Sequence, residues 1–296
     1  MSDYFRQKYV NIQFLPSESW VILNSIETDI KRKIEEIGTP LKDWNINISR
    51  GIITGFNEAF IIDSTIREKL INEDQNSAEI IRPILRGRDI KRFSYEYANL
   101  YIITTFPSLK IDINNYPAVK QYLTSFGIDR LKQTGDKNAR KKTNNKWFEV
   151  QDSISYWEDF YRLKIMYPNM TKFLPFYLDN KGFTQNDKSF MITGSKLYFL
   201  TAFFNSSLFK YCFINSFPEL QGGTRELRKI FFDKIPVIDI SQDIDDFFKP
   251  LVEKIQQLRN DNINSKELEI IIDQKIFDLY KLTTEEKLEI GFIEIQ

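Results

Sequence analysis

Apolar residues recur every three or four positions in several stretches of this chain, and this spacing predicts amphipathic helices. One such stripe lies near the start, formed by Ile22, Ile26, Ile30, Ile34 and Ile37. Gly38 and Pro40 follow the stripe, and both residues are expected to end a helix. Residues 1–44 are therefore interpreted as an N-terminal leader that contains one helix.

The tail of the chain has the longest stripe, formed by Ile244, Phe247, Phe248, Leu251, Val252, Ile255 and Leu258. A second helix is predicted over 268–279, and Thr283 with Glu286 has the spacing of a capping box that begins a third. Residues 241–296 are therefore expected to form a helical C-terminal segment. Helical spacing also occurs at 117–135, where Gly127 breaks it, and at 197–213.

Short apolar runs between these segments predict strands. Residues 48–63 indicate two strands around a glycine-containing turn, and 64–71 a helix whose Thr65 and Glu68 are spaced as a capping box. Further strands are predicted at 99–106, 162–168, 175–179 and 188–193. Alternation of strands with helices predicts a mixed α/β (α+β) fold, whose central unit covers residues 45–240.

The stretch at 80–93, "IIRPILRGRDIKRF", combines apolar and basic residues. We expect Ser77 to cap a short helix that Pro83 interrupts, and Gly87 to allow a tight turn. The apolar residues at 80, 81, 84 and 85 would anchor that turn in the core, with the arginines facing outward.

The composition is that of a water-soluble globular protein, with 42% hydrophobic and 28% charged residues in 296. No apolar run approaches the roughly 18 residues of a membrane span, and the polar start does not resemble a signal peptide. The single cysteine, Cys212, rules out an internal disulfide and is typical of a reducing cytoplasm. The 15% of aromatic residues serve a core, or in part supply ring faces for stacking on bases.

The chain contains no histidine, which excludes Ser-His-Asp and Cys-His catalysis and histidine-ligated zinc. It also lacks a GxxxxGK[ST] phosphate loop, a GxGxxG cofactor loop and the Asn/Asp-Pro-Pro-aromatic motif of adenine methyltransferases. Asp-x-Lys, a fragment of magnesium-dependent nuclease sites, starts at Asp29, Asp89, Asp179 and Asp273, a frequency close to chance. No cofactor or metal is therefore expected in this chain.

The net charge is zero, but residues 239–296 carry 14 acids and 7 bases, so the first 238 residues are basic. Two stretches concentrate this charge. The first, 82–92, holds Arg82, Arg86, Arg88, Lys91 and Arg92. The second, 130–146, holds Arg130, Lys132, Lys137, Arg140, Lys141, Lys142 and Lys146, followed by Trp147 and Phe148. A flexible basic loop that ends in aromatics suits phosphate contacts and stacking.

Arginine and amide side chains next to glycines are candidates for reading base edges. They occur around Gly51 and Gly55 and around Gly222 and Gly223. The alternative is that these are turn residues selected for backbone geometry. The full set of candidate DNA-binding residues is Arg50, Thr54, Asn57, Arg86, Arg88, Lys91, Arg92, Lys137, Arg140, Lys141, Lys142, Lys146, Trp147, Gln221, Thr224 and Arg225.

Six segments in order, "RGIITGFNEAFIID", "SAEIIRPILRGRDIKRF", "KWFEVQ", "FFNSSLFKY", "LQGGTRELRKIFFDKIPV" and "IFDLYKLTTEE", give the chain its family likeness. Over roughly 45–285 it resembles the TaqI-like C-terminal specificity domain of type IIG restriction-modification enzymes and adenine-specific DNA methyltransferases. The "GGTREL" stretch departs from the family pattern.

The resemblance implies a mixed-sheet target-recognition domain with flanking helices that binds double-stranded DNA in the cytoplasm and is not an enzyme by itself. An adenine-N6 methyltransferase/endonuclease part, in cis or in trans, would use S-adenosylmethionine and Mg²⁺. This interpretation is compatible with a chain that is an excised domain, a truncated product or a separate specificity subunit. A Mg²⁺-dependent endonuclease and a protein-interaction module are the alternatives.

Overall fold

Four strands form the central sheet of the computed structural model, which describes residues 24–293. Their order is β10-β8-β12-β2, and all neighbours run antiparallel. Every residue of β8 is buried, as expected for a strand in a sheet that is covered on both faces. The bounds are β2 Ile46–Arg50, β8 Lys164–Pro168, β10 Tyr177–Asp179 and β12 Ser189–Gly194.

A second four-stranded sheet has the order β11-β4-β7-β3. Strand β4 pairs in parallel with β11 and antiparallel with β7, so the sheet is mixed. The bounds are β3 Ile61–Asp63, β4 Ile81–Leu85, β7 Leu100–Ile103 and β11 Thr184–Gln185.

Three smaller sheets complete the β structure: β1 with β15, β5 with β6, and the series β13-β14-β9. All of their pairs are antiparallel. The bounds are β1 Gly38–Pro40, β5 Ile90–Lys91, β6 Ser94–Tyr95, β9 Met170–Thr171, β13 Glu219–Leu220, β14 Thr224–Glu226 and β15 Pro236–Ile238.

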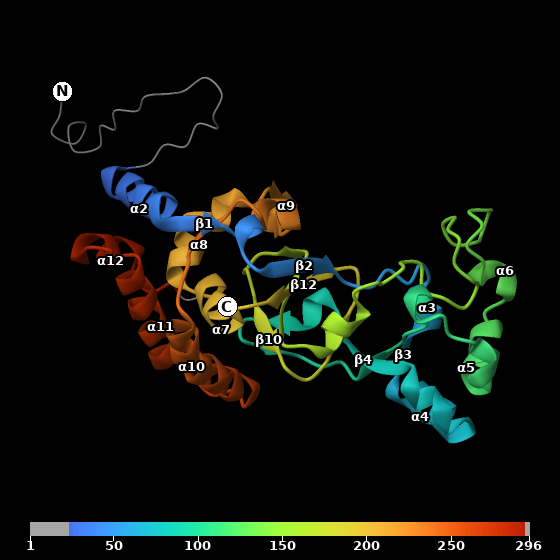
Figure 1. Cartoon of the computed structure of the whole chain (residues 1–296). Helices are drawn as coiled ribbons and strands as arrows, with labels where there is room; N and C mark the ends of the chain where they lie inside the picture. The colour runs from blue at the N-terminus through green and yellow to red at the C-terminus, as the bar shows by residue number, and fades with distance from the viewer. Residues whose placement is uncertain (1–23, 294–296) are drawn as a thin grey trace.

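Helices gather at both ends of the long molecule (Figure 1). At one end lie α2 Ser25–Ile37, α7 Leu197–Phe204, α8 Ser207–Phe213, α10 Gln242–Asn260, α11 Lys266–Leu279 and α12 Thr284–Ile290, whereas α9 Lys229–Phe232 lies nearer the central sheet. At the other end lie α3 Asn57–Phe60, α4 Ser64–Glu73, α5 Pro117–Thr124 and α6 Ile128–Leu131.

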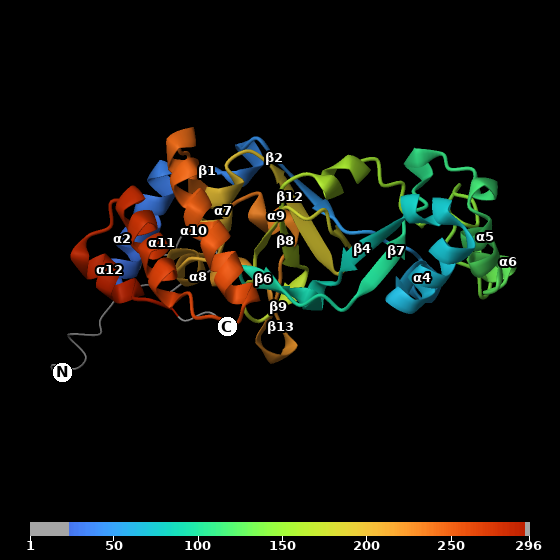
Figure 2. The same ribbon diagram turned by 90° about the horizontal axis from the view of Figure 1, so that it is seen from below.

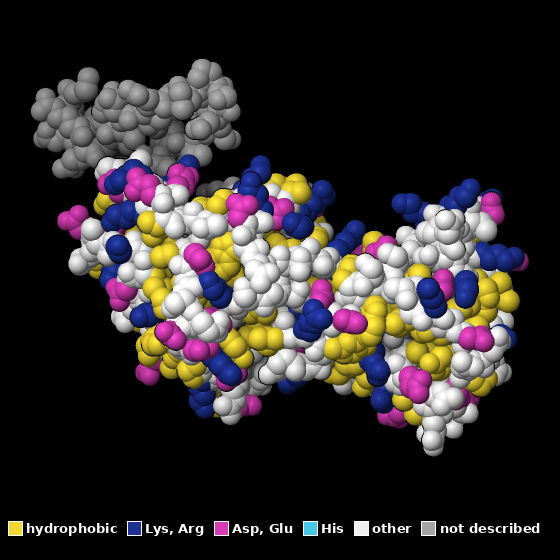
Figure 3. Space-filling view, viewed as in Figure 1, with side chains coloured by type: hydrophobic (Ala, Val, Ile, Leu, Met, Phe, Trp, Pro, Cys, Tyr) yellow, Lys and Arg dark blue, Asp and Glu magenta, His cyan; other side chains and the backbone are white. Residues whose placement is uncertain are grey.

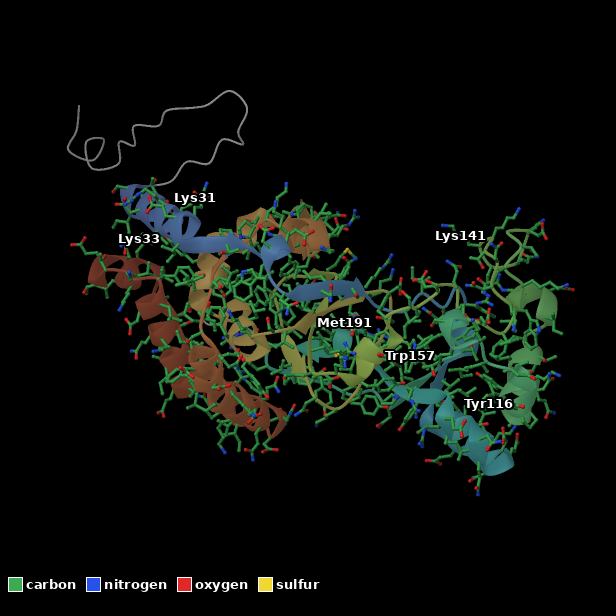
Figure 4. All side chains as sticks on the ribbon, viewed as in Figure 1. Lys31, Lys33, Tyr116, Lys141, Trp157 and Met191 are labelled. Atoms are coloured by element: carbon green, nitrogen blue, oxygen red, sulfur yellow. The ribbon has the colours of Figure 1, made fainter. Side chains whose placement is uncertain are left out.

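Two large apolar cores match this division. The first is rich in phenylalanine and is drawn mostly from residues 24–50 and 161–293, which we call the main lobe. The second is drawn from residues 52–160, the inserted lobe, together with Met191 of β12. Figure 4 shows Met191 in the middle of the molecule, where the lobes meet. The inserted lobe thus enters the chain between β2 and β8, two strands that both pair with β12.

The mixed α/β class predicted from the sequence is confirmed. Helix α2 ends at Ile37 as expected and begins with a capping box between Asn24 and Glu27. The tail forms the three predicted helices, and Thr283 and Glu286 form the predicted capping box of α12. Ile22 and the rest of 1–23 lie outside the described residues, and the boundaries at 44/45 and 240/241 stay predictions.

Three local predictions are wrong. Residues 57–60 form helix α3, because the Thr54 hydroxyl accepts the Phe56 amide hydrogen and so begins a turn. Asp63, rather than Thr65, caps α4 by accepting the Ile66 amide hydrogen. The stretch at 81–85 is strand β4, since its apolar residues are buried between β7 and β11.

Candidate functional site

The lobes join at the turn 186–188, which passes between Gly51 and Gly87, the glycines that follow Arg50 and Arg86. A Cβ atom on Gly51 would lie 2.0 Å from the Asn186 carbonyl oxygen, and one on Gly87 would lie 2.3 Å from that of Lys188. Both distances are far inside van der Waals contact, so only glycine fits at either position. The two Arg-Gly pairs of the sequence therefore form one structural junction, with Arg50 and Arg86 beside it.

The two junction arginines differ in how their charge is compensated. Arg50 donates from Nε to the Asp187 carbonyl oxygen at 3.1 Å, and its Nη2 lies 3.6 Å from the Asp187 carboxylate, a longer and more solvent-exposed ion pair, with the Arg50 side chain 45% exposed. Arg86 binds the Asp89 carboxylate with two bonds of 2.9 and 2.8 Å. This hydrogen bonding raises the pKa of Arg86. Arg50 therefore has donors left for a ligand, whereas Arg86 is largely committed to Asp89.

Arg92 lies in the interior, so the prediction that it contacts DNA is corrected. Its guanidinium pairs with Glu269 of α11 and donates to the Asn205 carbonyl oxygen at 2.7 Å. Arg259 shares the same carboxylate at 2.6 Å. Burial works to raise the pKa of Glu269, but Arg92, Ser265 and Arg259 outweigh it and lower the pKa. Arg92 thus fastens β5 to the C-terminal helices.

The remaining bases of 82–92 face outward to different degrees. Arg82 donates to the Tyr161 hydroxyl at 3.2 Å. Lys91 pairs with the exposed Glu96 at 3.2 Å. Arg88 is exposed and makes no hydrogen bond or ion pair with any residue in the described part of the chain. Of this segment, Arg88 is the side chain best placed to meet a ligand.

Arg140 is also a correction, because its side chain is only 2% exposed. Its guanidinium donates four hydrogen bonds of 2.7–2.8 Å to backbone carbonyl oxygens, those of Leu131, Thr54, Glu149 and Trp147. Burial lowers its pKa to about 10, so the group stays charged at neutral pH. Arg140 holds the second basic stretch together from the inside.

Side-chain bonds fix the rest of this stretch, which we call the basic loop (residues 132–149). The Thr143 hydroxyl donates to Gln133 Oε1 at 2.6 Å, and Gln133 Nε2 donates to the Glu149 carbonyl oxygen at 3.0 Å. Asn145 Nδ2 donates to the Gln151 carbonyl oxygen at 2.9 Å. The prediction of a loop is confirmed, but the expected flexibility is wrong, since this network sets its conformation.

The lysines of the basic loop point away from this network. Lys137, Lys141 and Lys142 are exposed and have no hydrogen-bond or ion-pair partner among residues 24–293. Lys146 is exposed and lies 5.5 Å from the ring centre of Phe148. Figure 3 shows basic side chains along this tip of the inserted lobe, and Figure 4 shows Lys141 there. The loop therefore presents uncompensated positive charge from a fixed backbone.

Two other candidates near the loop are less available than expected. Trp147 is half-buried and lies edge-on to Phe148. Thr54 is 1% exposed and donates to Asn57 Oδ1 at 2.6 Å, so its predicted DNA contact is corrected. Asn57 itself is exposed, and its amide nitrogen remains open to a ligand.

The "QGGTRE" stretch forms a hairpin of β13 and β14, which projects from the main lobe in Figure 2. Gly222 and Gly223 both have φ of 77°, a conformation that favours glycine. Gln221 is exposed at the tip, and Thr224 is half-buried. Arg225 pairs with Glu219 across the hairpin at 2.7 Å.

The aspartates of the Asp-x-Lys pairs have structural partners. Asp89 binds Arg86, Asp179 binds the fully buried Lys164, and Asp273 accepts from Ser207. Among residues 24–293, no three carboxylate or cysteine side chains come together as metal ligands. Within the same residues, no helix combines the length and apolar character needed to cross a bilayer.

Sequence reasoning missed Lys172, which follows β9. It is exposed, has no partner in the described chain and lines the same hollow as Arg88. The two residues are far apart in the sequence, and they come together because β8, which precedes Lys172, packs against the Gly87–Asp89 turn and β5. No local pattern signals such a pair.

Comparisons with known proteins identify a family profile and two solved structures that are similar to the chain. The family profile described as "TaqI-like C-terminal specificity domain" matches residues 82–237, more than half of the chain. The fold is similar to that of the type IIG restriction endonuclease BpuSI, with a TM-score of 0.51, 14% identity and coverage of 87% of this chain and 33% of that one. It is also similar to the type IIL restriction-modification enzyme MmeI, solved in complex with DNA, with a TM-score of 0.58, 11% identity and coverage of 86% and 36%.

This chain thus spans about a third of the length of those two enzymes. No curated protein sequence matches it. At such low identities the structural likeness establishes the fold, while the profile establishes the family. The resemblance noted from the sequence is confirmed: the chain belongs to the TaqI-like C-terminal specificity domain family.

Proposed function

We propose that this chain recognises a specific site in double-stranded DNA for a type IIG restriction-modification system. Its family is that of a specificity domain, and the similar MmeI was solved in complex with DNA. The basic loop is the observation that carries the proposal, because its exposed lysines keep their charge and its backbone is fixed beforehand. A prearranged row of cations loses little entropy when phosphates bind.

Phosphate contacts would position the chain on DNA without reading its sequence. Reading base edges needs forked or amide groups, and the exposed amides of Asn57 and Gln221 suit this role. Arg50 has unused donors beside the junction. Thr224 and Arg225 on the projecting hairpin complete the proposed reading set.

We further propose that the chain does not catalyse a reaction by itself. An adenine-N6 methyltransferase/endonuclease part, in the same polypeptide or in a partner subunit, would use S-adenosylmethionine and Mg²⁺. The cytoplasm, where DNA and the cofactor would be found together, is the proposed location.

Selection from randomised duplexes, followed by mobility-shift titration, tests the proposal. We expect one sequence to be enriched, and the K141Q/K142Q variant to bind all sequences more weakly. Its slope of log affinity against log salt should fall by about 1.8, since each lost phosphate contact removes about 0.9. K42Q/K110Q is the matched control, because both lysines are exposed and have no partner among the described residues.

Two results would contradict the proposal. One is the absence of duplex binding even at low salt, with and without a methyltransferase partner. The other is site-specific cutting of a plasmid by the purified chain with Mg²⁺, which would assign catalysis to the chain itself.

A further inference from the structure

A groove of about 510 Å³ lies where residues 87–94 of the inserted lobe meet the main lobe, outside the basic loop and the reading set. Its walls are the Gly87–Asp89 turn with β5, the segment that begins at β9, and the end of α10. It continues into a hollow of about 410 Å³ that shares Arg259 and Asn262 with it and reaches Lys266. The two hollows adjoin at Arg259 and Asn262, and we call them together the depression, which reaches from the Gly87–Asp89 turn to the turn between α10 and α11.

Every charged side chain that lines this depression is a cation: Arg88, Lys91, Arg92, Lys172, Arg259 and Lys266. Arg92 and Arg259 share a single carboxylate, that of Glu269, so the three together keep one positive charge. Arg88 and Lys172 have no partner in the described chain. The Nε atoms of Arg92 and Arg259 are buried without a hydrogen-bond partner there. The ligand that suits this depression is an extended anion.

Apolar side chains stand beside these cations. Met170 is 52% exposed and Phe173 is 43% exposed, and both line the groove. A single small anion would leave this apolar surface in water. A nucleic-acid strand offers charged phosphates together with sugar and base faces, and so satisfies both kinds of surface. Its length also fits a depression that continues past one binding position.

We propose that this groove binds the sugar-phosphate backbone of one DNA strand, with Arg88 and Lys172 on phosphates and Phe173 and Met170 against the sugar or base faces. This inference rests on the proposed function, since the strand belongs to the duplex that the chain recognises. It adds, where the two lobes meet, a DNA contact separate from the basic loop. It also places DNA beside Arg259 and Lys266, at the turn between α10 and α11 of the acidic helical segment.

Salt titrations of duplex binding test the groove through R88Q/K172Q. Both side chains are exposed and without partners in the described residues, so thermal unfolding should be unchanged. We expect affinity to fall about 10- to 100-fold, and the salt slope to fall by about 1.8. F173A should weaken binding without changing the slope, because it removes an uncharged contact. K42Q/K110Q should match the wild type in both measurements.

The outcomes separate the two proposals. If K141Q/K142Q lowers affinity and slope while R88Q/K172Q changes neither, the groove proposal is overturned and the proposed function stands. If the wild-type chain binds no duplex, both are overturned. A fall in affinity and slope for both variants supports both.

Discussion

Residues 82–92 and residues 130–146 are equally basic in sequence, yet the structure compensates their buried arginines in different ways. In the first segment Arg86 and Arg92 bind carboxylates, those of Asp89 and Glu269. In the second segment Arg140 binds only neutral carbonyl oxygens. Much of the first segment's charge is therefore cancelled inside the protein. In the second segment Lys132 pairs with Asp129 at 2.7 Å, but Arg140, Lys137, Lys141 and Lys142 form no ion pair with any described residue.

The difference shows how to interpret arginine in a basic stretch. A guanidinium has five N–H donors in a fixed fork and can gather several acceptors at once. Lysine has a compact charge that stays hydrated, and in the basic loop the lysines remain exposed around the buried Arg140. Counting bases in a sequence thus overestimates the arginines available to a ligand and identifies the lysines more reliably.

The largest expected effect on the free energy of unfolding comes from removing Glu269, the carboxylate that pairs with Arg92 and Arg259. E269A would leave Arg92 in the interior without its partner and would also unpair Arg259. Removing one member of a buried ion pair typically costs 3–5 kcal/mol, and we expect about that loss in the free energy of unfolding. Urea denaturation of wild type and variant measures it.

The double variant R92M/E269M is the control, because it removes the buried charge of Arg92 that E269A leaves unpaired, while the remaining Arg259 side chain is 36% exposed to water. It should recover a large part of the stability that E269A loses. A loss below about 1 kcal/mol in E269A would show that the pair does not fasten the lobes.

The pH dependence of stability provides a second contrast between the two segments. Carboxylates such as those around Arg92 titrate, whereas the carbonyl oxygens around Arg140 do not. Burial raises the pKa of Asp273, which faces this cluster, from 3.8 to about 6, although Ser207 opposes the shift. Between pH 4 and 6 the folded state retains a proton that the unfolded state has released. The free energy of unfolding should therefore fall as pH rises through this window, by on the order of 3 kcal/mol from this group.

Urea denaturation of wild type and D273N at pH 4 and pH 7 isolates this contribution, since the other titrating groups are common to both proteins. We expect D273N to gain stability relative to wild type at pH 7 compared with pH 4. An equal difference at both pH values would mean that Asp273 is ionised throughout the range.

Local patterns were sufficient for most of the fold. The stripes at 25–37 and 242–290 gave the right helices, because burial of one helix face imposes a spacing that the sequence shows directly. The strand at 81–85 was missed, since a short apolar run with a proline fits either state until its partners are known. The insertion of 52–160 between β2 and β8 depends on pairing with the distant β12, which no local pattern encodes.

The candidate site was predictable as a region rather than residue by residue. The exposed Lys137, Lys141 and Lys142 follow from a polar stretch without apolar spacing. The burial of Arg140 does not, because its acceptors come from three separate parts of the chain. Gly51 and Gly87 were recognised as turn residues, but their shared neighbour at 186–188 is visible only in three dimensions.

The smallest of these effects on stability is expected from replacing Arg140, whose guanidinium donates to four carbonyl oxygens. R140M would keep the apolar stem but leave the four carbonyl oxygens without their donor. Each bond contributes about 1 kcal/mol, but local opening would let water reach the carbonyls, so we expect a loss of about 2 kcal/mol. Limited proteolysis at the basic loop should become faster, and duplex affinity should fall because the lysines no longer share one fixed backbone.

R140K decides whether the charge of Arg140 or its geometry matters. An ammonium group keeps the charge but has three donors and a different shape, so it cannot reach four carbonyl oxygens in the same positions. If geometry matters, R140K should resemble R140M in both proteolysis and affinity, with a loss of stability relative to wild type that is the same at pH 4 and pH 7. Full recovery of affinity by R140K would mean that the loop needs only a positive charge at this position, and that its lysines bind DNA without a prearranged backbone.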